Sequence, residues 1–408
     1  MNKWSRILCL CLLFIVFSRF GSAEIKQMVR QTDAYFSTVS MLILYDEAVE
    51  TSRFSETWAE VKSILAQIDE AVSLSYPDSD VSRFNSLSCG ERIAISPITA
   101  EILSVALGAY ETTGGLYDPT VYPLVDLWGF SPRFNRNVYK PVMPYDRAYE
   151  NGVLPLPDPE DIAALLPLVG LSGIALTEEN GTWYLQKNTP SVQLDDMLIH
   201  AQLDLGGIAK GYACDRVMDC LRRRGYTMGH FVCGGSSMAI LSRPSEDGLA
   251  ALTIGKPRPG SAASSHYATV RVRDLTLSTS SDTSHAFMLD GVRYCHIIDP
   301  RTGWPAAAGS NPQRGAASVT LLAPSAALSD ALTTALFLMP PQEACAFIRE
   351  HLPEDRVITT LYSADSDAIE VITNIPEGGM TIDDPSYRIA SSLDESGFMR
   401  YTGTFFSP

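Results

Sequence analysis

Four stretches of the chain repeat apolar residues at helical spacing. The first covers residues 57–74, the second begins at Pro97 and ends at the Gly114–Gly115 pair, and the third runs from Ile208 to about Arg224. A fourth, around residues 329–336, is predicted to begin at Pro324 and Ser325, since both residue types are common at helix starts. These stretches predict helices that pack in layers against neighbouring strands.

Short runs of β-branched, aromatic and other apolar residues lie between the predicted helices. An opening strand is predicted at residues 38–45. Further strands are predicted at residues 182–185, 192–194, 202–205, 230–233, 239–241, 251–254, 268–272 and 318–321. The mixture predicts an α+β fold, a single unit of mixed β-sheet layers flanked by helices.

The first 23 residues have the pattern of a secretory signal peptide. Lys3 and Arg6 precede an apolar run at residues 7–17, and small residues at 21–23 offer a cleavage site after Ala23. The apolar run is about half the ~20 residues that a membrane-spanning helix needs. We therefore expect export across the cytoplasmic membrane, to the periplasm or cell envelope, with a retained membrane anchor as the alternative.

The rest of the chain is expected to form one domain over residues 24–374. Residues 130–160 contain six prolines and little periodicity, which predicts a surface excursion within that domain. Residues 375–408 are acidic and contain Gly, Ser and Pro, which predicts a peripheral C-terminal tail.

The charge balance of the chain bears on which partners it can bind. The chain has 31 basic and 47 acidic residues, a formal charge of -16, which argues against sequence-independent binding to nucleic acid. A polyphosphate substrate would need local help from a metal, a helix terminus or a lysine. Two of the eight cysteines lie in the signal peptide, and the other six contain no Cys-x-x-Cys pair, so they are expected to be small buried residues with at most one disulfide.

One candidate phosphate site lies at residues 203–212, where a predicted strand runs into Gly206–Gly207 and then into a helix. A helix start offers free N–H groups and positive dipole character, and Lys210 adds a full charge. The spacing matches neither G-x-x-x-x-G-K-[ST] nor G-x-G-x-x-G, which disfavours the P-loop and Rossmann classes. On spacing alone, an ordinary strand–turn–helix remains an equal alternative.

A candidate metal site lies on the fourth predicted helix. Asp330 and Thr334 are four residues apart and share one face. A carboxylate and a hydroxyl are hard oxygen ligands that suit Mg²⁺. The competing interpretation is an ordinary pair on a solvated helix face.

Two further segments carry candidate chemistry. Residues 277–282 form a hydroxyl-rich segment, predicted as a loop, that is suited to phosphate or ribose oxygens, and His296 follows as a candidate general base. Leu116, Tyr117 and neighbouring residues beside Gly114–Gly115 suit a flat ring. The alternatives are a structural histidine and an ordinary core cluster.

Taken in their order along the chain and with residues 76–85 (YPDSDVSRFN), these four segments resemble the signature motifs of the ApbE family, the FAD:protein FMN transferases. The resemblance covers about Tyr35 to Pro340, with residues 36–39 as the counterpart of the family's opening strand. It departs from the family at Ser281, where glycine is usual, and at Thr283, where an aromatic residue is common.

The resemblance implies Mg²⁺-dependent transfer of FMN from FAD to a threonine hydroxyl of an acceptor protein, with release of AMP. The acceptor is expected to be a subunit of a membrane electron-transfer complex. Alternatives that use the same residues are an Mg²⁺-dependent FAD pyrophosphatase, which yields FMN and AMP, and a non-catalytic exported FAD-binding protein.

The resemblance also assigns roles to individual residues. His296 and Asp330 are the implied catalytic residues, with His296 as base for the acceptor hydroxyl. The implied Mg²⁺ ligands are the backbone oxygen of Gly207 with Asp330 and Thr334. The implied FAD-binding residues are Leu116, Tyr117, Asp118, Asp204, Lys210, Ser278, Thr279, Ser280 and Asp282.

Overall fold

The structure is a computed structural model and describes ten segments of the chain. They are residues 25–46, 51–131, 156–245, 247–257, 266–283, 285–289, 292–306, 316–362, 369–384 and 387–405. The predicted signal peptide and most of the proline-containing excursion at 130–160 lie outside these residues.

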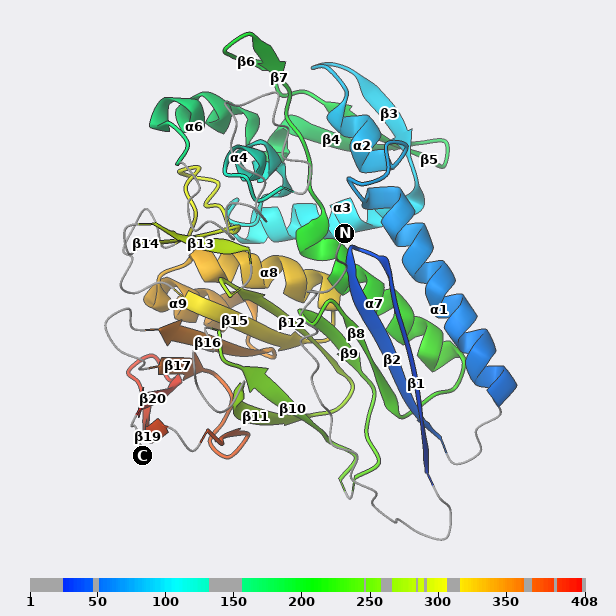
Figure 1. Ribbon diagram of the computed structural model, residues 1–408, viewed down its shortest axis with the longest axis vertical. Coiled ribbons are helices and arrows are strands. Elements are labelled where there is room, and N and C mark those ends of the chain that lie inside the picture. Colours follow the sequence, from blue (N-terminus) through cyan, green and yellow to red (C-terminus); the bar gives the residue numbers. More distant parts are fainter. Residues whose placement is uncertain are drawn as a thin grey trace, which may run out of the picture.

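A ten-stranded antiparallel sheet forms the centre of the molecule (Figure 1). In spatial order its strands are β1 (Lys26–Tyr35), β2 (Thr38–Asp46), β8 (Gly229–Cys233), β9 (Ser237–Ile240), β12 (Leu275–Ser281), β15 (Ala316–Ala323), β16 (Arg356–Tyr362), β17 (Ile369–Thr373), β20 (Met399–Phe405) and β19 (Tyr387–Leu393). Strand β12 lies near the middle, paired with β9 on one side and β15 on the other.

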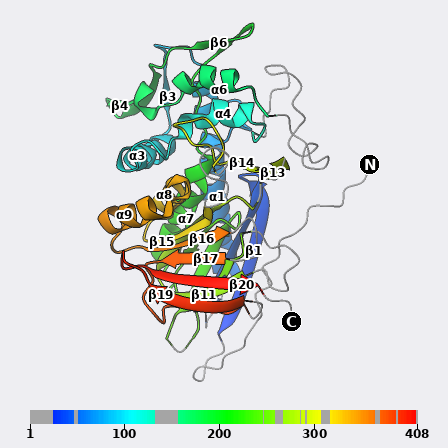
Figure 2. The ribbon, with the colours of Figure 1, turned by 90° about the vertical axis from the view of Figure 1, so that its left-hand side faces the viewer.

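Both faces of this sheet are covered. Helices pack on one face, and a three-stranded sheet packs on the other over the C-terminal half (Figure 2). Alternation along β15 shows why, because Leu321 belongs to the helix-side core whereas Leu322 belongs to the core on the opposite face. The helices are α1 (Thr51–Val72), α3 (Pro97–Thr112), α7 (Gly206–Arg223), α8 (Ala326–Leu338) and α9 (Pro341–His351), and the small sheet contains β10 (Ala250–Gly255), β11 (His266–Val272) and β18 (Met380–Ile382).

A smaller region lies beyond α3 and α8, at the top of Figure 1. Its own apolar cluster is built around Trp128, whose indole nitrogen donates to the carbonyl of Gly303 at 2.8 Å. Its elements are α2 (Asp80–Asn85), β3 (Arg92–Ile95), η1 (Pro119–Val121), α4 (Tyr122–Leu127), α6 (Pro159–Leu165), η2 (Leu166–Leu168), η3 (Leu171–Gly173), β4 (Ile174–Glu179), β5 (Thr182–Lys187), β6 (Val192–Leu194) and β7 (Met197–Ile199). The hairpin of β13 (Ala286–Leu289) and β14 (Val292–Cys295) lies next to α8 (Figure 1) and joins the same apolar cluster through Phe287 and Tyr294.

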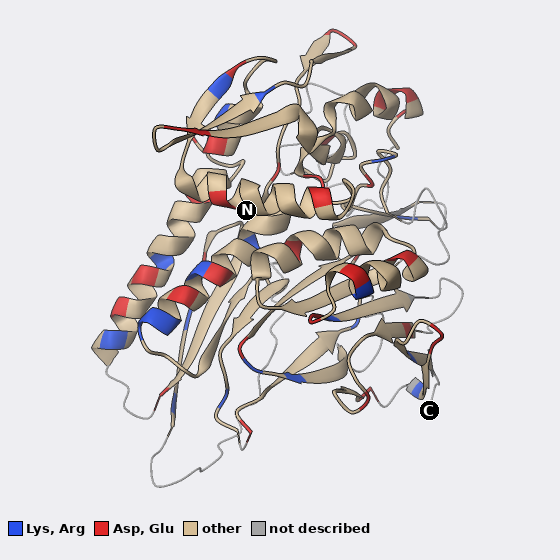
Figure 3. Cartoon of the chain, turned by 180° about the vertical axis from the view of Figure 1, so that it is seen from behind, with Lys and Arg blue, Asp and Glu red and all other residues tan. Residues whose placement is uncertain are grey.

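The outer surfaces of α1 and α7 carry charges of both signs (Figure 3). Glu60 on α1 accepts from Arg224, directly after α7, at 2.6 Å, and Arg223 approaches the same carboxylate at 3.5 Å. These ion pairs therefore link the two helices across their outer surface.

The α+β class and all four predicted helices are confirmed, and the fourth begins at Ser325, whose side chain caps Leu328 N–H. Two predictions are wrong: residues 202–205 are not a strand, and the hydroxyl-rich segment at 278–281 lies in strand β12, not in a loop. The six cysteines in the described part of the chain are free thiols, five of them buried.

Residues 375–408 differ from the predicted peripheral tail. Within the described part of this segment, β18 joins the three-stranded sheet, and β19 and β20 extend the central sheet at its edge. Phe398 and Tyr401 are buried in the two cores on opposite faces. The prediction of a tail weighed the acidic and Gly/Ser/Pro composition of this segment. It gave too little weight to the alternation of apolar and polar residues, which is the pattern of a strand.

Candidate functional site

The start of α7 brings a carboxylate, two glycines and a lysine together. Asp204 accepts a hydrogen bond from Gly206 N–H at 2.7 Å, and Lys210 Nζ donates to the carbonyl of Gly206 at 2.5 Å. Of the first N–H groups of this helix, Gly206 donates to Asp204, and Ile208 and Ala209 donate to Leu205 O, so among these groups Gly207 N–H keeps its capacity to bind an anion. The positive helix end and Lys210 therefore make this segment suited to phosphate.

Helices α7 and α8 cross closely at Gly211. A Cβ atom at Gly211 would lie 2.6 Å from the carbonyl carbon of Ala326, so any larger residue would push the helices apart. Asp330 on α8 accepts from Gly211 N–H at 3.1 Å and is only 5 % exposed. Burial raises the pKa of Asp330, whereas the charge of Lys210 opposes that rise. The crossing thus holds a buried carboxylate next to the start of α7.

Strand β12 presents its hydroxyl groups to α8 alternately. Ser280 donates to Thr333 Oγ1 at 2.9 Å, and its Oγ lies 3.4 Å from Thr334 Oγ1. Ser278 also faces α8, with its Oγ 3.4 Å from the carbonyl of Ala326. Thr279 instead meets Thr320 of β15 at 2.9 Å. Ser278 and Ser280 therefore join the α8 side, and Thr279 does not.

The segment after α3 places an aromatic ring against the α7 start. Tyr117 is buried, and a Cβ at Gly207 would lie 3.9 Å from its ring. Its hydroxyl is buried and has no hydrogen-bond partner. Burial raises the pKa of Tyr117, and the carboxylates of Asp330 and Asp204 add to this effect. Tyr117 is therefore part of the cluster and has an unused hydrogen-bonding group.

The two neighbours of Tyr117 serve the local fold. Leu116 is buried in the main core. Asp118 accepts from Thr120 N–H at 2.8 Å and from Thr120 Oγ1 at 2.6 Å, which caps η1. Burial raises the pKa of Asp118 to about 6. The structure thus gives both residues a packing or capping role beside the site.

His296 directly follows β14 at the edge of this cluster. Its backbone N–H donates to His285 O at 3.0 Å, and its buried Nδ1 has no hydrogen-bond partner. Burial lowers the pKa of His296 to about 4, helped by the positive charges of His285 and Lys210. The ring is therefore neutral near pH 7 and able to accept a proton.

Asp282 is placed differently from the other predicted residues. It is buried, its carboxylate lies 3.4 Å from Arg293 Nε, and its carbonyl accepts from the same guanidinium. These contacts connect the end of β12 to the β13–β14 hairpin. The structure supports a role in holding that hairpin, which carries His296 at its end.

Sequence reasoning missed the turn between β8 and β9, residues 234–237. Gly234 and Gly235 both have positive φ, and a Cβ at Gly234 would lie 3.3 Å from Lys210 Cδ. Ser237 hydrogen-bonds to Asp330, whose pKa it lowers. The Gly-Gly-Ser-Ser sequence between two predicted strands was the available signal, because paired glycines permit close approach of a backbone to a ligand.

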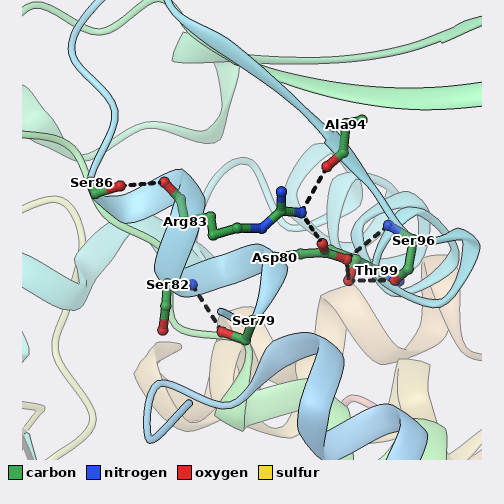
Figure 4. A network of polar contacts seen from close by, with 8 residues as sticks. All are labelled: Ser79, Asp80, Ser82, Arg83, Ser86, Ala94, Ser96 and Thr99. Carbon is green, nitrogen blue, oxygen red and sulfur yellow. Dashed lines mark hydrogen bonds and ion pairs between the residues drawn. The ribbon is translucent and has the colours of Figure 1, made fainter. Parts of the chain in front are cut away.

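A second polar network holds the region around α2 in place (Figure 4). Asp80 accepts from Ser96 N–H at 2.8 Å, Thr99 Oγ1 at 2.7 Å and Arg83 at 2.6 Å. At the other end of α2, Asn85 bonds both backbone groups of Leu203, at 2.8 and 2.9 Å. This network therefore fixes the segment that enters the Asp204–Gly207 turn.

Two general observations bear on what the site can hold. The described residues contain no group of three or more His, Cys, Asp or Glu side chains arranged to hold a metal ion. A hollow of about 230 Å³ lies elsewhere, between Asp215, Arg222 and Ser325, and contains none of the predicted site residues. The candidate site therefore rests on the chemistry and convergence of its side chains.

Similar proteins place this arrangement in a family. Curated relatives named FAD:protein FMN transferase include those of Vibrio cholerae O395 (29 % identical, covering 76 % of this chain and 80 % of the relative) and Treponema pallidum Nichols (27 %, covering 85 % and 88 %). The flavin transferase ApbE from Vibrio cholerae has a similar structure, with a TM-score of 0.65 and 26 % identity over 86 % of this chain and 96 % of that one. The ApbE protein of Thermotoga maritima shares the fold, with a TM-score of 0.64 and 24 % identity over 82 % of this chain and 94 % of that one. Residues 36–358 match the model of the ApbE family, and the chain therefore belongs to it.

Proposed function

We propose that this protein transfers FMN from FAD to a threonine hydroxyl of an acceptor protein and releases AMP. The observation that carries the proposal is the position of Asp330, a buried carboxylate at the α7–α8 crossing, beside Lys210 and the start of α7. The name of the curated relatives supports the same reaction class. The proposal joins a site suited to a pyrophosphate with a family of flavin transferases.

FAD is proposed to lie across the start of α7. Lys210 and Gly207 N–H are suited to its pyrophosphate, and Tyr117 offers a ring and an unused hydroxyl. Asp204 fixes the turn and Ser278 and Ser280 face the same cluster. Leu116, Asp118, Thr279 and Asp282 have other partners in the structure, so their proposed contacts to FAD rest on the resemblance alone.

Mg²⁺ is the proposed metal, and the donor set fits it. One carboxylate oxygen of Asp330 accepts from Gly211 N–H, Thr334 is partly exposed on the next turn, and Gly207 lies one helical turn before Gly211. A carboxylate, a hydroxyl and a carbonyl are hard oxygens, and Mg²⁺ usually takes few protein ligands. Held by Asp330, Thr334 and Gly207 O, the ion would neutralise charge on the pyrophosphate.

The protein's own part in the transfer is proton handling and orientation. The acceptor hydroxyl oxygen forms a bond to the FMN phosphorus, the bond from that phosphorus to the AMP oxygen breaks, and AMP leaves with the electron pair. His296 is proposed to take the hydroxyl proton, because it is neutral near pH 7 and its Nδ1 has no partner. Lys210 would hold the pyrophosphate in position for this displacement.

The compartment and the acceptor are also proposals. The first 23 residues favour export, so the acceptor is proposed to be a periplasmic or cell-envelope subunit of a membrane electron-transfer complex. Among the described residues, no helix is both long enough and apolar enough to span a membrane.

Mass spectrometry of a threonine-containing acceptor domain tests the reaction. The acceptor is incubated with the protein, FAD and Mg²⁺, with Asp330→Ala as the inactive control and with EDTA in a parallel sample. A gain of one FMN that requires Mg²⁺ and is lost in the variant supports the proposal. AMP without a modified acceptor would indicate hydrolysis, and neither product would indicate a flavin-binding protein.

A further inference from the structure

His296 has a second imidazole beside it. The ring centroids of His285 and His296 lie 5.4 Å apart with an interplanar angle of 54°, and the His296 N–H donates to the His285 carbonyl at 3.0 Å. His285 lies directly before β13 and His296 directly after β14, so the paired strands hold the two rings together. His285 has no role in the proposed function, and its ring lies next to that of His296.

The two rings differ in their access to solvent. His285 is exposed, whereas His296 is partly buried and lies within the electrostatic reach of Lys210. Asp282 and Arg293, the other charged groups in the described part of this hairpin and the segment before it, pair with each other. His296 therefore lies between the candidate site and a solvent-exposed imidazole.

We propose that His285 and His296 form a two-histidine proton relay, an inference that rests on the proposed function. When the acceptor hydroxyl bonds to phosphorus, its proton moves to His296 and gives an imidazolium. That proton then passes to the His285 ring, directly or through one water, and from there to solvent. His296 returns to its neutral form before the next turnover, and His285 is a positioning and relay residue that does not contact FAD.

The backbone allows this relay to be tested without unfolding the hairpin. The contact from His296 N–H uses the carbonyl of His285, which every substitution retains. His285 has φ of 53°, in the left-handed region that asparagine tolerates better than most residues. His285→Asn therefore removes the imidazole and keeps the backbone preference, while His285→Ala leaves space for a small molecule.

The experiment measures FMN transfer at saturating FAD, in a non-imidazole buffer and with added imidazole. We expect His285→Asn and His285→Ala to lose roughly tenfold in rate, with FAD affinity unchanged. Added imidazole should restore most of the rate of His285→Ala, because it supplies the missing proton acceptor. His351→Asn, at the exposed end of α9, is the matched control and should behave as wild type.

Each outcome decides the proposal. Rescue of His285→Ala by imidazole, without a change in FAD affinity, supports the relay. An active wild type with unaffected His285 variants, or a rate loss that imidazole does not restore, overturns the relay and leaves the proposed function standing. A wild-type protein that transfers no FMN removes both.

Discussion

Asp80 and Asp330 are both buried carboxylates, and their surroundings are opposite. Asp80 is 7 % exposed and accepts from a backbone N–H, a threonine hydroxyl and Arg83, all within 2.8 Å. Asp330 is 5 % exposed, and its bond from Gly211 N–H is 3.1 Å long. Burial opposes ionisation of Asp80, but these hydrogen bonds lower its pKa, whereas burial raises the pKa of Asp330.

We propose that the difference separates a structural carboxylate from a functional one. A buried charge stabilises a fold only when hydrogen bonds replace the lost water, as they do around Asp80. Around Asp330 the hydrogen bonds from Gly211 N–H and Ser237 and the charge of Lys210 leave the pKa raised, and we propose that a cation supplies the missing compensation. Under-satisfied carboxylates of this kind concentrate at functional sites.

The largest expected effect comes from Asp330→Asn. The amide keeps the shape and can still accept from Gly211 N–H, but it loses the charge that a cation needs. We expect FMN transfer to fall about a thousandfold, as measured by mass spectrometry of the acceptor. Because the pKa of Asp330 is raised in the folded state, its ionisation costs stability as the pH rises from the unfolded pKa to that raised pKa, and the full cost is present above it. The metal-free variant should therefore melt at or above the wild-type temperature at pH 7.

Adding Mg²⁺ supplies the control for this comparison. The ion should raise the melting temperature of the wild-type protein by mass action and leave that of Asp330→Asn unchanged. A variant that melts well below wild type in EDTA, or one that keeps its Mg²⁺ response, would show that Asp330 is a structural residue like Asp80.

Asp80→Ala should give the converse result, with a large loss of stability and a smaller loss of rate. The free energy of unfolding should fall by about 3 kcal/mol at pH 7, because the donors of Ser96 and Thr99 lose their acceptor. The lowered pKa means that the contribution of Asp80 is present above its unfolded pKa of about 3.9 and is lost as the pH falls. Urea denaturation at pH 7 and at about pH 3 measures this. A difference between variant and wild type that is equal at both pH values contradicts the assignment.

Elements with strong local signals were predictable from the sequence. Helices α3 and α8 begin where Pro97 and Ser325 indicate, because capping and proline preferences act within one turn. The sequence does not predict the edge strand β1, since none of its residues is fully buried and the strand depends on pairing with β2. Strand β12 was read as a loop because Ser and Thr dominate it, yet its neighbours β9 and β15 make it central.

The site was predictable as a set of residues and only partly as a geometry. The resemblance identifies motifs that are far apart in the sequence, and the fold brings four of their residues together: Tyr117, Asp204, Lys210 and Asp330. The orientation of Thr279 depends on which face of β12 meets α8, and a segment predicted as a loop carries no such information. The contribution of Ser237 depends on the pairing of β9 with β12, which is a non-local contact.

The smallest expected effects come from two adjacent residues on β12, and they test which face of the strand belongs to the site. Ser280→Ala removes a hydroxyl that donates to Thr333 beside Asp330, so we expect a loss of about fivefold in the FMN transfer rate with little change in stability. Thr279→Val removes a hydroxyl that meets Thr320 on the opposite face, so stability should fall by about 1 kcal/mol. The rate should stay at the wild-type value, against the contact to FAD that the resemblance alone implies for Thr279. Successive side chains of a strand point to opposite faces, so the two effects should not mix. If Thr279→Val lowers the rate and Ser280→Ala does not, then FAD approaches β12 from the face away from α8. Asp330 would then not lie at the centre of the site.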